Sequence, residues 1–229
     1  MKYEIKGENF PVVIINLESG EGIRTEGGGM AWMTPNMSME TEGGGSLGKA
    51  FGRLFSGEKV FRNIYRANGG QGMIAVNAKV PGAIVPIEIT PDRPIIAQKS
   101  AFLACTEGVD TEVFFNKKFS TGLFGGEGFI MQKIYGNGIV FLEVDGSTIE
   151  YELGSGQTII VDTGNIAMMD ATCSMDIQTV SGVKNVLFGG EGLFNTVITG
   201  PGKVVLQTLP IKSIAEAIIP FIPTQSSSN

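Results

Sequence analysis

The sequence lacks histidine altogether and contains only two cysteines in 229 residues. Without histidine, Ser-His-Asp and Cys-His nucleophiles, histidine general bases and most catalytic zinc and iron sites are excluded. Cys105 and Cys173 form no CxxC motif and stand in apolar surroundings, where cysteine usually serves as a small buried hydrophobic residue. We therefore expect no disulfide framework, no cofactor and no enzymatic activity. An enzyme that uses carboxylates alone, with or without a divalent metal, stays an alternative.

Positive charge and long apolar runs are also scarce. The 17 Lys and Arg residues are outnumbered by 23 Asp and Glu residues, which gives a net charge of −6. Nucleic-acid binding needs a basic face that displaces counterions from phosphates, so no nucleic-acid partner is expected. The longest apolar run, residues 10–15, is far shorter than the ~20 residues of a membrane helix. Residues 1–6 are polar and unlike a signal peptide. We expect a cytoplasmic protein without a transmembrane segment, and peripheral membrane contact stays open.

Glycine, in contrast, is abundant, and it marks a repeat. The sequence FGGEGF at residues 124–129 recurs 64 residues later as FGGEGL at residues 188–193, with a fainter copy at residues 55–58. A second block, which begins at Leu17, recurs without gaps at Ile89 and Leu153. Both blocks keep their order, so we predict three repeats of about 64–72 residues in one domain, residues 1–208. The predicted repeats are residues 1–76, 77–142 and 143–208, followed by a tail at residues 209–229.

The patterns within a repeat predict short strands. In the last full unit we expect six, near residues 139–145, 147–153, 157–162, 165–170, 173–179 and 193–199. Asn137-Gly138 and Asp145-Gly146 can supply the positive φ values of tight hairpin turns. Turn signals at this spacing are typical of sandwiches, barrels or β-helix-like sheet stacks. We predict an all-β fold with short, sandwich-like sheets and three repeats around a pseudo-threefold axis.

One short helix is expected, in the tail. Residues 211–219 place isoleucines on one stripe between Pro210 and Pro220, and proline commonly bounds a helix. A helix of about nine residues is not stable in water by itself. The stripe must therefore pack on something. We favour the chain's own body, with a neighbouring subunit as the alternative.

The repeated glycine-glutamate turns are the candidate site. The turn motif comprises Gly57, Glu58, Gly126, Glu127, Gly128, Gly190, Glu191 and Gly192. We favour a structural role, in which each glutamate accepts hydrogen bonds from backbone amides of its own turn. The alternatives are a Ca²⁺ or Mg²⁺ site built by converging carboxylates Glu58, Glu127 and Glu191, and a catalytic carboxylate pair. Glu40, Glu112 and Asp176 form a second equivalent set.

Methionines gather in the first and third repeats, at Met30, Met33, Met37, Met39, Met168, Met169 and Met175. Together with Trp32 they can line an apolar ligand cavity. Their alternation along strands favours core packing instead, where methionine fills irregular gaps.

Several of these segments resemble a known family. They are the glycine-glutamate segments at residues 57–72, 124–128 and 190–192, and Gly200-Pro201-Gly202 with residues 204–207. They resemble the bacterial branch of the altered-inheritance-of-mitochondria (mitochondrial biogenesis) family, a former domain-of-unknown-function family, over residues 10–208. The resemblance implies a pseudo-threefold, all-β fold grouped with tryptophan-RNA-binding-attenuation-protein-like, short double-stranded β-helix domains. It implies no catalytic residues.

The function expected from these observations is a non-enzymatic scaffold or interaction protein that forms homo-oligomers, because a repeated β fold supplies extended surfaces. One alternative is a binding module for a small or lipid-like ligand in a Met-rich apolar cavity. The other is a carboxylate- or metal-dependent enzyme.

Overall fold

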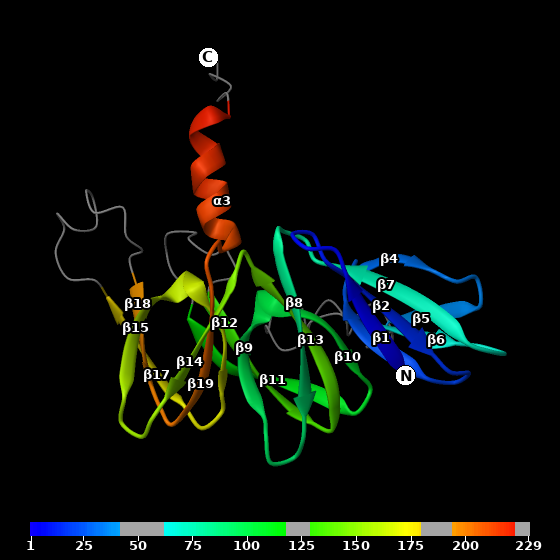
Figure 1. Cartoon of the computed structure of the whole chain (residues 1–229), viewed down its shortest axis with the longest axis horizontal. Helices are drawn as coiled ribbons and strands as arrows, with labels where there is room; N and C mark the ends of the chain where they lie inside the picture. The colour runs from blue at the N-terminus through cyan, green and yellow to red at the C-terminus, as the bar shows by residue number, and fades with distance from the viewer. Residues whose placement is uncertain (42–61, 118–128, 180–193, 223–229) are drawn as a thin grey trace, which may run out of the picture.

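A computed structural model of the chain describes residues 1–41, 62–117, 129–179 and 194–222. These residues form 19 strands and one α-helix, α3 (Ile211–Ile218), together with short 3-10 turns (Figure 1). The predicted all-β fold with a short C-terminal helix is therefore confirmed.

The strands form three units of six, preceded by one extra strand, β1 (Lys2–Lys6). The first unit contains β2 (Val12–Leu17), β3 (Gly22–Glu26), β4 (Met30–Met33), β5 (Met37–Thr41), β6 (Arg62–Ala67) and β7 (Gly72–Asn77). The second contains β8 (Gly82–Ile89), β9 (Ile95–Gln98), β10 (Phe102–Thr106), β11 (Val109–Lys117), β12 (Phe129–Gly136) and β13 (Gly138–Asp145). The third contains β14 (Thr148–Leu153), β15 (Thr158–Asp162), β16 (Ile166–Asp170), β17 (Ser174–Thr179), β18 (Phe194–Thr199) and β19 (Gly202–Gln207).

The six strands predicted between residues 139 and 199 are confirmed, each within one residue at either end. The first two units end with β7 and β13, so the two connections between units follow Asn77 and Asp145. The division of the sequence at residues 76 and 142 stays a prediction.

Each unit repeats one pairing pattern. Its last strand lies between its first and third strands: β7 between β2 and β4, β13 between β8 and β10, and β19 between β14 and β16. Its fifth strand lies between its second and fourth strands. The third strand carries a β-bulge at one equivalent place, between Met30 and Trp32, Phe102 and Ala104, and Ile166 and Met168. The three units therefore share one strand topology.

Two of the four sheets are shared between units. The order β5-β6-β3-β10-β13-β8 joins half of the first unit to half of the second. The order β11-β12-β9-β16-β19-β14 joins the second unit to the third in the same way. In both, the second strand of one unit pairs with the third strand of the next. The remaining halves form two smaller sheets, β1-β2-β7-β4 and β15-β18-β17.

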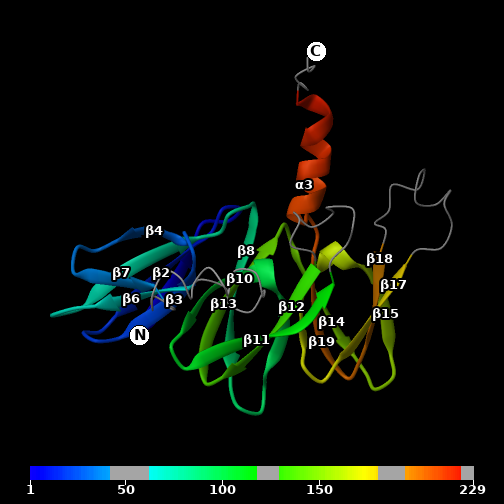
Figure 2. The same cartoon turned by 180° about the vertical axis from the view of Figure 1, so that it is seen from behind.

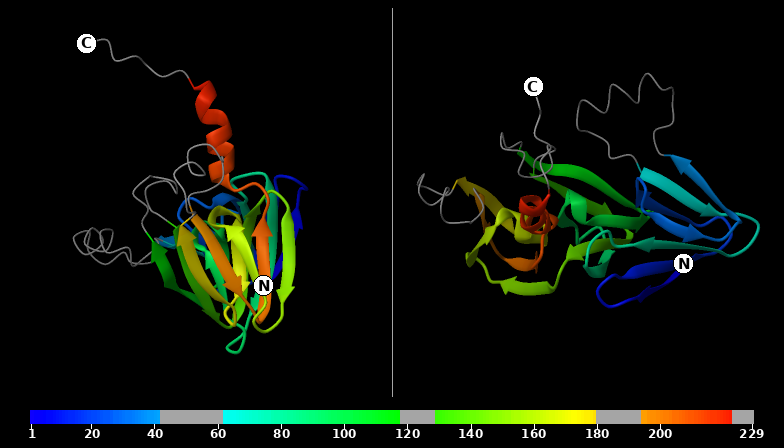
Figure 3. Two further views of the ribbon diagram at one scale, coloured as in Figure 1. Left: turned by 90° about the vertical axis from the view of Figure 1, so that its left-hand side faces the viewer. Right: turned by 90° about the horizontal axis from the view of Figure 1, so that it is seen from above.

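The units follow one another along the long axis of the molecule. The sheet with β4 lies at one end and the sheet with β15 at the other, as Figure 1 and the reverse view in Figure 2 both show. The view from above in Figure 3 places the first and third units at opposite ends as well. The units do not close on one another, because β4 and β15 are edge strands in the described sheets. A pseudo-threefold axis through one chain therefore stays a prediction.

Three hydrophobic cores lie along this axis, one for each unit. A strand at the junction between two units contributes to two of them, because a strand has side chains on both of its faces. Leu103 and Ala104 belong to the second unit but lie in the first core, whereas their neighbour Cys105 lies in the second. In the same way Met168 of the third unit lies in the second core. Each unit thus completes the core of the unit before it.

The helix α3 follows β19 and projects from the body (Figures 1 and 3). None of its residues is buried, so the prediction that it packs on the chain's own body is wrong. The strand that leads into it, β19, is already flanked by β14 and β16 and offers no open edge. The start of the helix is held to the body: the Ile211 amide donates to Asp145 Oδ2 at 2.9 Å.

Candidate interaction surfaces

The predicted glycine-glutamate turns fall outside the described residues. This applies to Gly57, Glu58, Gly126, Glu127, Gly128, Gly190, Glu191 and Gly192. Their structural role and the alternative metal site both stay predictions. Within residues 1–41, 62–117, 129–179 and 194–222, no group of three or more Cys, Asp or Glu side chains is placed to hold a metal ion.

The second set of equivalent acids is described, and the structure does not bring it together. Glu40, Glu112 and Asp176 lie opposite Ile64, Lys133 and Val197 in their strand pairs, so they occupy one equivalent register position. They belong to three different sheets. Glu112 has its own ion pair, at 3.6 Å from Lys133 Nζ. A shared carboxylate site at these positions is therefore not formed within one chain.

The methionines mostly fill the cores, as their alternation predicts. Met37, Met168 and Met169 are buried. Met39 is an exception, with 53% of its surface exposed. Trp32, which the predicted cavity groups with the methionines, is 48% exposed. Two cavities, of about 390 and 570 Å³, are described, and no methionine lines either of them. The Met-rich ligand cavity therefore gains no support from these two sites.

Among the described carboxylates, Glu143 has the most perturbed pKa, and it lies between the first two units. Burial raises the pKa of Glu143 to about 7, and the negative charge of nearby Glu26 acts in the same direction. The Lys79 amide donates to Glu143 Oε2 at 2.8 Å, and the Lys79 ammonium binds Glu26 Oε2 at 2.5 Å. Burial also raises the pKa of Glu26. A carboxylate with a shifted pKa can mark a catalytic site. The residue at the equivalent position of the second junction tests this interpretation for Glu143.

The counterpart of this acidic pair is a pair of neutral amides. Gln207 occupies the position of Glu143, and Gln98 occupies that of Glu26, as the equivalent strand registers show. Gln207 Nε2 donates to Gln98 Oε1 at 3.3 Å and to the Gly164 carbonyl at 2.8 Å. Both pairs link one unit to the next by hydrogen bonds. This common role indicates that Glu143 is a structural residue of the junction.

Ion pairs reinforce the first junction further. Arg24 on β3 donates to the Val109 carbonyl at 3.0 Å and to Asp110 Oδ1 at 3.1 Å on the second unit. Arg66 on β6 makes two hydrogen bonds to Glu107, and this carboxylate raises the pKa of the guanidinium. These contacts show how one unit recognises the next through polar as well as apolar groups.

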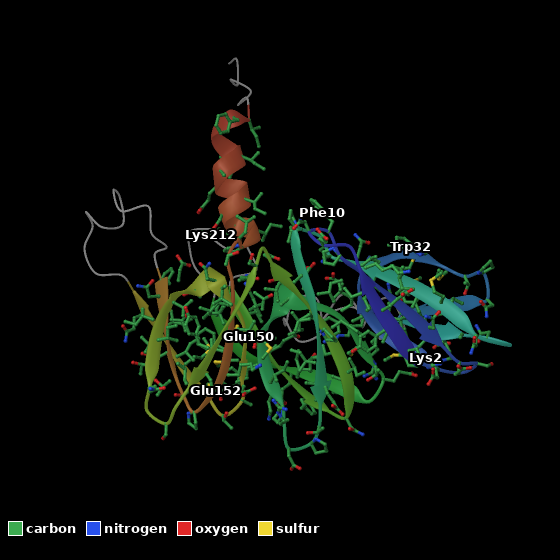
Figure 4. All side chains as sticks on the ribbon, in the orientation of Figure 1. Lys2, Phe10, Trp32, Glu150, Glu152 and Lys212 are labelled. Atoms are coloured by element: carbon green, nitrogen blue, oxygen red, sulfur yellow. The ribbon has the colours of Figure 1, made fainter. Side chains whose placement is uncertain are left out.

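The two end strands, β4 and β15, have exposed side chains at positions whose equivalents in other units are buried. Trp32 is 48% exposed, whereas its equivalents Ala104 and Met168 are 0% and 4% exposed. Ile160 is 65% exposed, whereas its equivalent Ile96 is 1% exposed. Figure 4 shows Trp32 on the first unit, at the end of the molecule remote from the third unit. Positions that are buried inside a junction are therefore occupied by exposed apolar side chains at each end of the molecule.

The tail provides a third exposed apolar surface. Ile218 and Ile219 are 53% and 61% exposed, and Phe221 just beyond the helix is 84% exposed. Lys212 and Glu216 pair with each other along α3 at 3.6 Å. Among the described helices, none is long and apolar enough to span a membrane.

Taken together, the structure defines an all-β protein of three linked units with an open strand edge at each end. The chain belongs to the mitochondrial biogenesis AIM24 family, which it matches over residues 3–209. This match confirms the family resemblance of its glycine-glutamate and glycine-proline-glycine segments.

Two streptococcal proteins are similar over almost the whole chain. An uncharacterized protein of Streptococcus pyogenes serotype M6 is 30% identical, over 99% of this chain and 93% of the relative. The crystal structure of a Streptococcus pyogenes protein has a TM-score of 0.80 and 27% identity, and covers 96% of this chain and 99% of that one. These similarities establish family and fold, and neither description names a biochemical role.

Proposed function

We propose that this chain is a non-enzymatic scaffold or interaction protein, acting in the cytoplasm, that self-associates through the open strands at its two ends. The observation that carries the proposal is the exposure of Trp32 on β4 and Ile160 on β15. An edge strand presents unpaired amides and carbonyls, and natural proteins normally protect such edges with charges, prolines or covering segments. The edges at β4 and β15 carry large apolar side chains instead, which is typical of an interaction site.

The chemistry of the described residues supports a role in interaction. The described equivalent acids Glu40, Glu112 and Asp176 lie in separate sheets. The perturbed acid Glu143 accepts a hydrogen bond from a backbone amide in a junction between units. Cys105 and Cys173 are both buried free thiols, which fits a reducing compartment. A repeated β architecture needs no catalytic group to act as a scaffold.

The proposed self-association is tested by measuring the mass of the particles in solution at a series of protein concentrations. We expect native mass spectrometry and sedimentation of the wild-type chain to show oligomers that dissociate on dilution. Ile160→Lys should weaken association at least tenfold, because complete burial of an isoleucine contributes about 1.5–3 kcal/mol and about 1.4 kcal/mol corresponds to a factor of ten.

The matched control is Ile149→Lys on the edge strand β14. Ile149 is 41% exposed, yet β14 takes no part in either internal junction. This variant should associate like the wild type. A wild-type chain that stays monomeric throughout the concentration series would refute the proposal.

A further inference from the structure

The two internal junctions have the same strand register. In the first, Ala104, Cys105 and Thr106 on β10 lie opposite Thr25, Arg24 and Ile23 on β3. In the second, Met168, Met169 and Asp170 on β16 lie opposite Ala97, Ile96 and Ile95 on β9. Corresponding residues are 64 apart on the third strands and 72 apart on the second strands, in agreement with the sequence repeat. The junction is therefore one interface used twice.

Each junction also inserts the same side-chain positions into the preceding core. Leu103, Ala104 and Phe141 of the second unit lie in the first core. Ala167, Met168 and Val205 of the third unit lie in the second core. The third core contains, among the described residues, no such contribution from a following unit. The equivalent positions in the first unit are Ala31, Trp32 and Ala75, since Trp32 pairs with Ala75 as Ala104 pairs with Phe141.

The halves left over at the two ends are therefore complementary. The third unit ends in the half-sheet β17-β18-β15, and the first unit begins with β4-β7-β2, to which β1 is added. Placed edge to edge, they have the strand order of the two shared six-stranded sheets. In one chain they cannot meet, because they lie at opposite ends of the long axis (Figure 1).

We infer that β15 of one copy pairs antiparallel with β4 of a second copy and forms a third junction of the same kind. Resting on the proposed self-association, this inference specifies its register: Trp32 opposite Val161, Met33 opposite Ile160, and Thr34 opposite Ile159. The occupant of each exposed end is thus a second copy of this chain, which offers the complementary half-sheet.

The side chains fit this arrangement. Trp32 enters the third core, where Val161 and Ile198 are buried and Ile159 and Ile177 are only partly buried. In return Ile160 reaches the first core beside Met30 and Met33, which are also partly buried there. Its equivalent Ile96 makes the corresponding insertion into the third core. Both copies therefore bury apolar surface that the isolated chain exposes.

The ion pair between Arg24 and Asp110 in the first junction has no charged counterpart in the inferred third junction. The position of Arg24 is held by Ile160, and the position of its partner Asp110 is held by Ser38. Because both members of the ion pair are absent, the third junction buries no unpaired charge at this place.

Cysteine pairs at the inferred register provide the test. Directly opposed residues of antiparallel strands have Cβ atoms about 4.5–5.5 Å apart, near the separation that a disulfide requires. Met33→Cys and Ile160→Cys are made in separate chains, mixed at equal concentration and oxidised mildly. We expect a disulfide-linked dimer that contains one chain of each kind. Either variant alone should stay uncrosslinked, which also controls for Cys105 and Cys173.

A pair displaced along the strand checks the register. Met33→Cys mixed with Thr158→Cys moves one thiol by two residues on the same face, and at least a tenfold lower yield is expected. Equal yields from the two mixtures would overturn the inference while self-association stands. Oligomers in native mass spectrometry without any disulfide between positions 33 and 160 would do the same. Monomers alone would refute the proposed function as well.

Discussion

At the scale of single residues, the buried carboxylate Glu143 makes stability depend on pH. Its folded pKa of about 7 lies above the ordinary value of 4.5 because burial disfavours the charged form. The folded chain therefore holds this proton more tightly than the unfolded chain does. The resulting stability is complete below pH 4.5 and is lost as the pH rises to about 7.

Glu143→Gln should remove this pH dependence. The glutamine oxygen can still accept from the Lys79 amide, and Gln207 shows that a neutral amide fits the equivalent position. Relative to the wild type, we expect little difference near pH 4.5 and a gain in unfolding free energy of up to about 3 kcal/mol above pH 7. Urea denaturation at a series of pH values measures the difference.

The exposed carboxylate Glu88, on the neighbouring strand β8, serves as the control. Glu88→Gln makes the same chemical change at an exposed position, without relieving a buried group, so its effect on the free energy of unfolding should be small. A constant difference between Glu143→Gln and the wild type from pH 4.5 to 8 would contradict the assignment of the raised pKa to this residue.

At the scale of elements, α3 is expected to have no part in holding copies together. The inferred interface lies at β4 and β15, and α3 starts from the end of β19 in the middle of a described sheet. Removal of residues 210–229 should therefore leave the oligomer mass unchanged, less the tail itself. Sedimentation of the truncated and complete chains compares them directly.

The same truncation tests the alternative role of the tail. A chain without α3 that dissociates to monomers would make the helix the contact between subunits. Helix α3 has only eight residues, so it needs a partner to be stable. A loss of helical circular dichroism that accompanies dissociation of the complete chain on dilution would show that a neighbouring copy holds α3.

The strands themselves could be predicted well from the sequence. Strands such as Val12–Leu17 and Thr158–Asp162 are rich in β-branched residues. Tight turns separate neighbouring strands, as Asp145-Gly146 does between β13 and β14, with Gly146 at φ 76°. These are local signals. The tail helix was equally evident from its proline boundaries, whereas its surroundings were not, because they depend on which strand edges the body leaves open.

At the scale of the whole molecule, the pairing between units escaped prediction. The gapless alignment made Trp32 equivalent to Ala104 and Met168, but it did not reveal that β3 pairs with β10 and β9 with β16. Such pairings join residues about 70 to 80 positions apart in sequence, beyond the range of periodicity and turn signals. An open array and a closed ring of three units have the same sequence repeat. Trp32 was therefore assigned to a core that one chain alone does not complete.

The open array also determines the symmetry of the proposed assembly. β4 and β15 are different strands, so their contact is heterologous, and each added copy still exposes one free edge of each kind. Such contacts produce closed rings or open filaments instead of a self-limiting dimer. We expect the wild-type chain to have either one ring mass larger than a dimer or a mass that grows with concentration.

Blocking one end in each of two variants should reduce this assembly to a dimer. Trp32→Lys removes a usable β4 edge, and Ile160→Lys removes a usable β15 edge; both positions are exposed in the single chain, so each variant should fold. Alone, each retains only one working edge and should be monomeric. In an equimolar mixture, the intact β15 of the first variant meets the intact β4 of the second, and a one-to-one dimer should form. Native mass spectrometry with one variant isotope-labelled identifies this species. Homodimers of either single variant would instead require an interface with twofold symmetry, which the pairing of β15 with β4 does not provide.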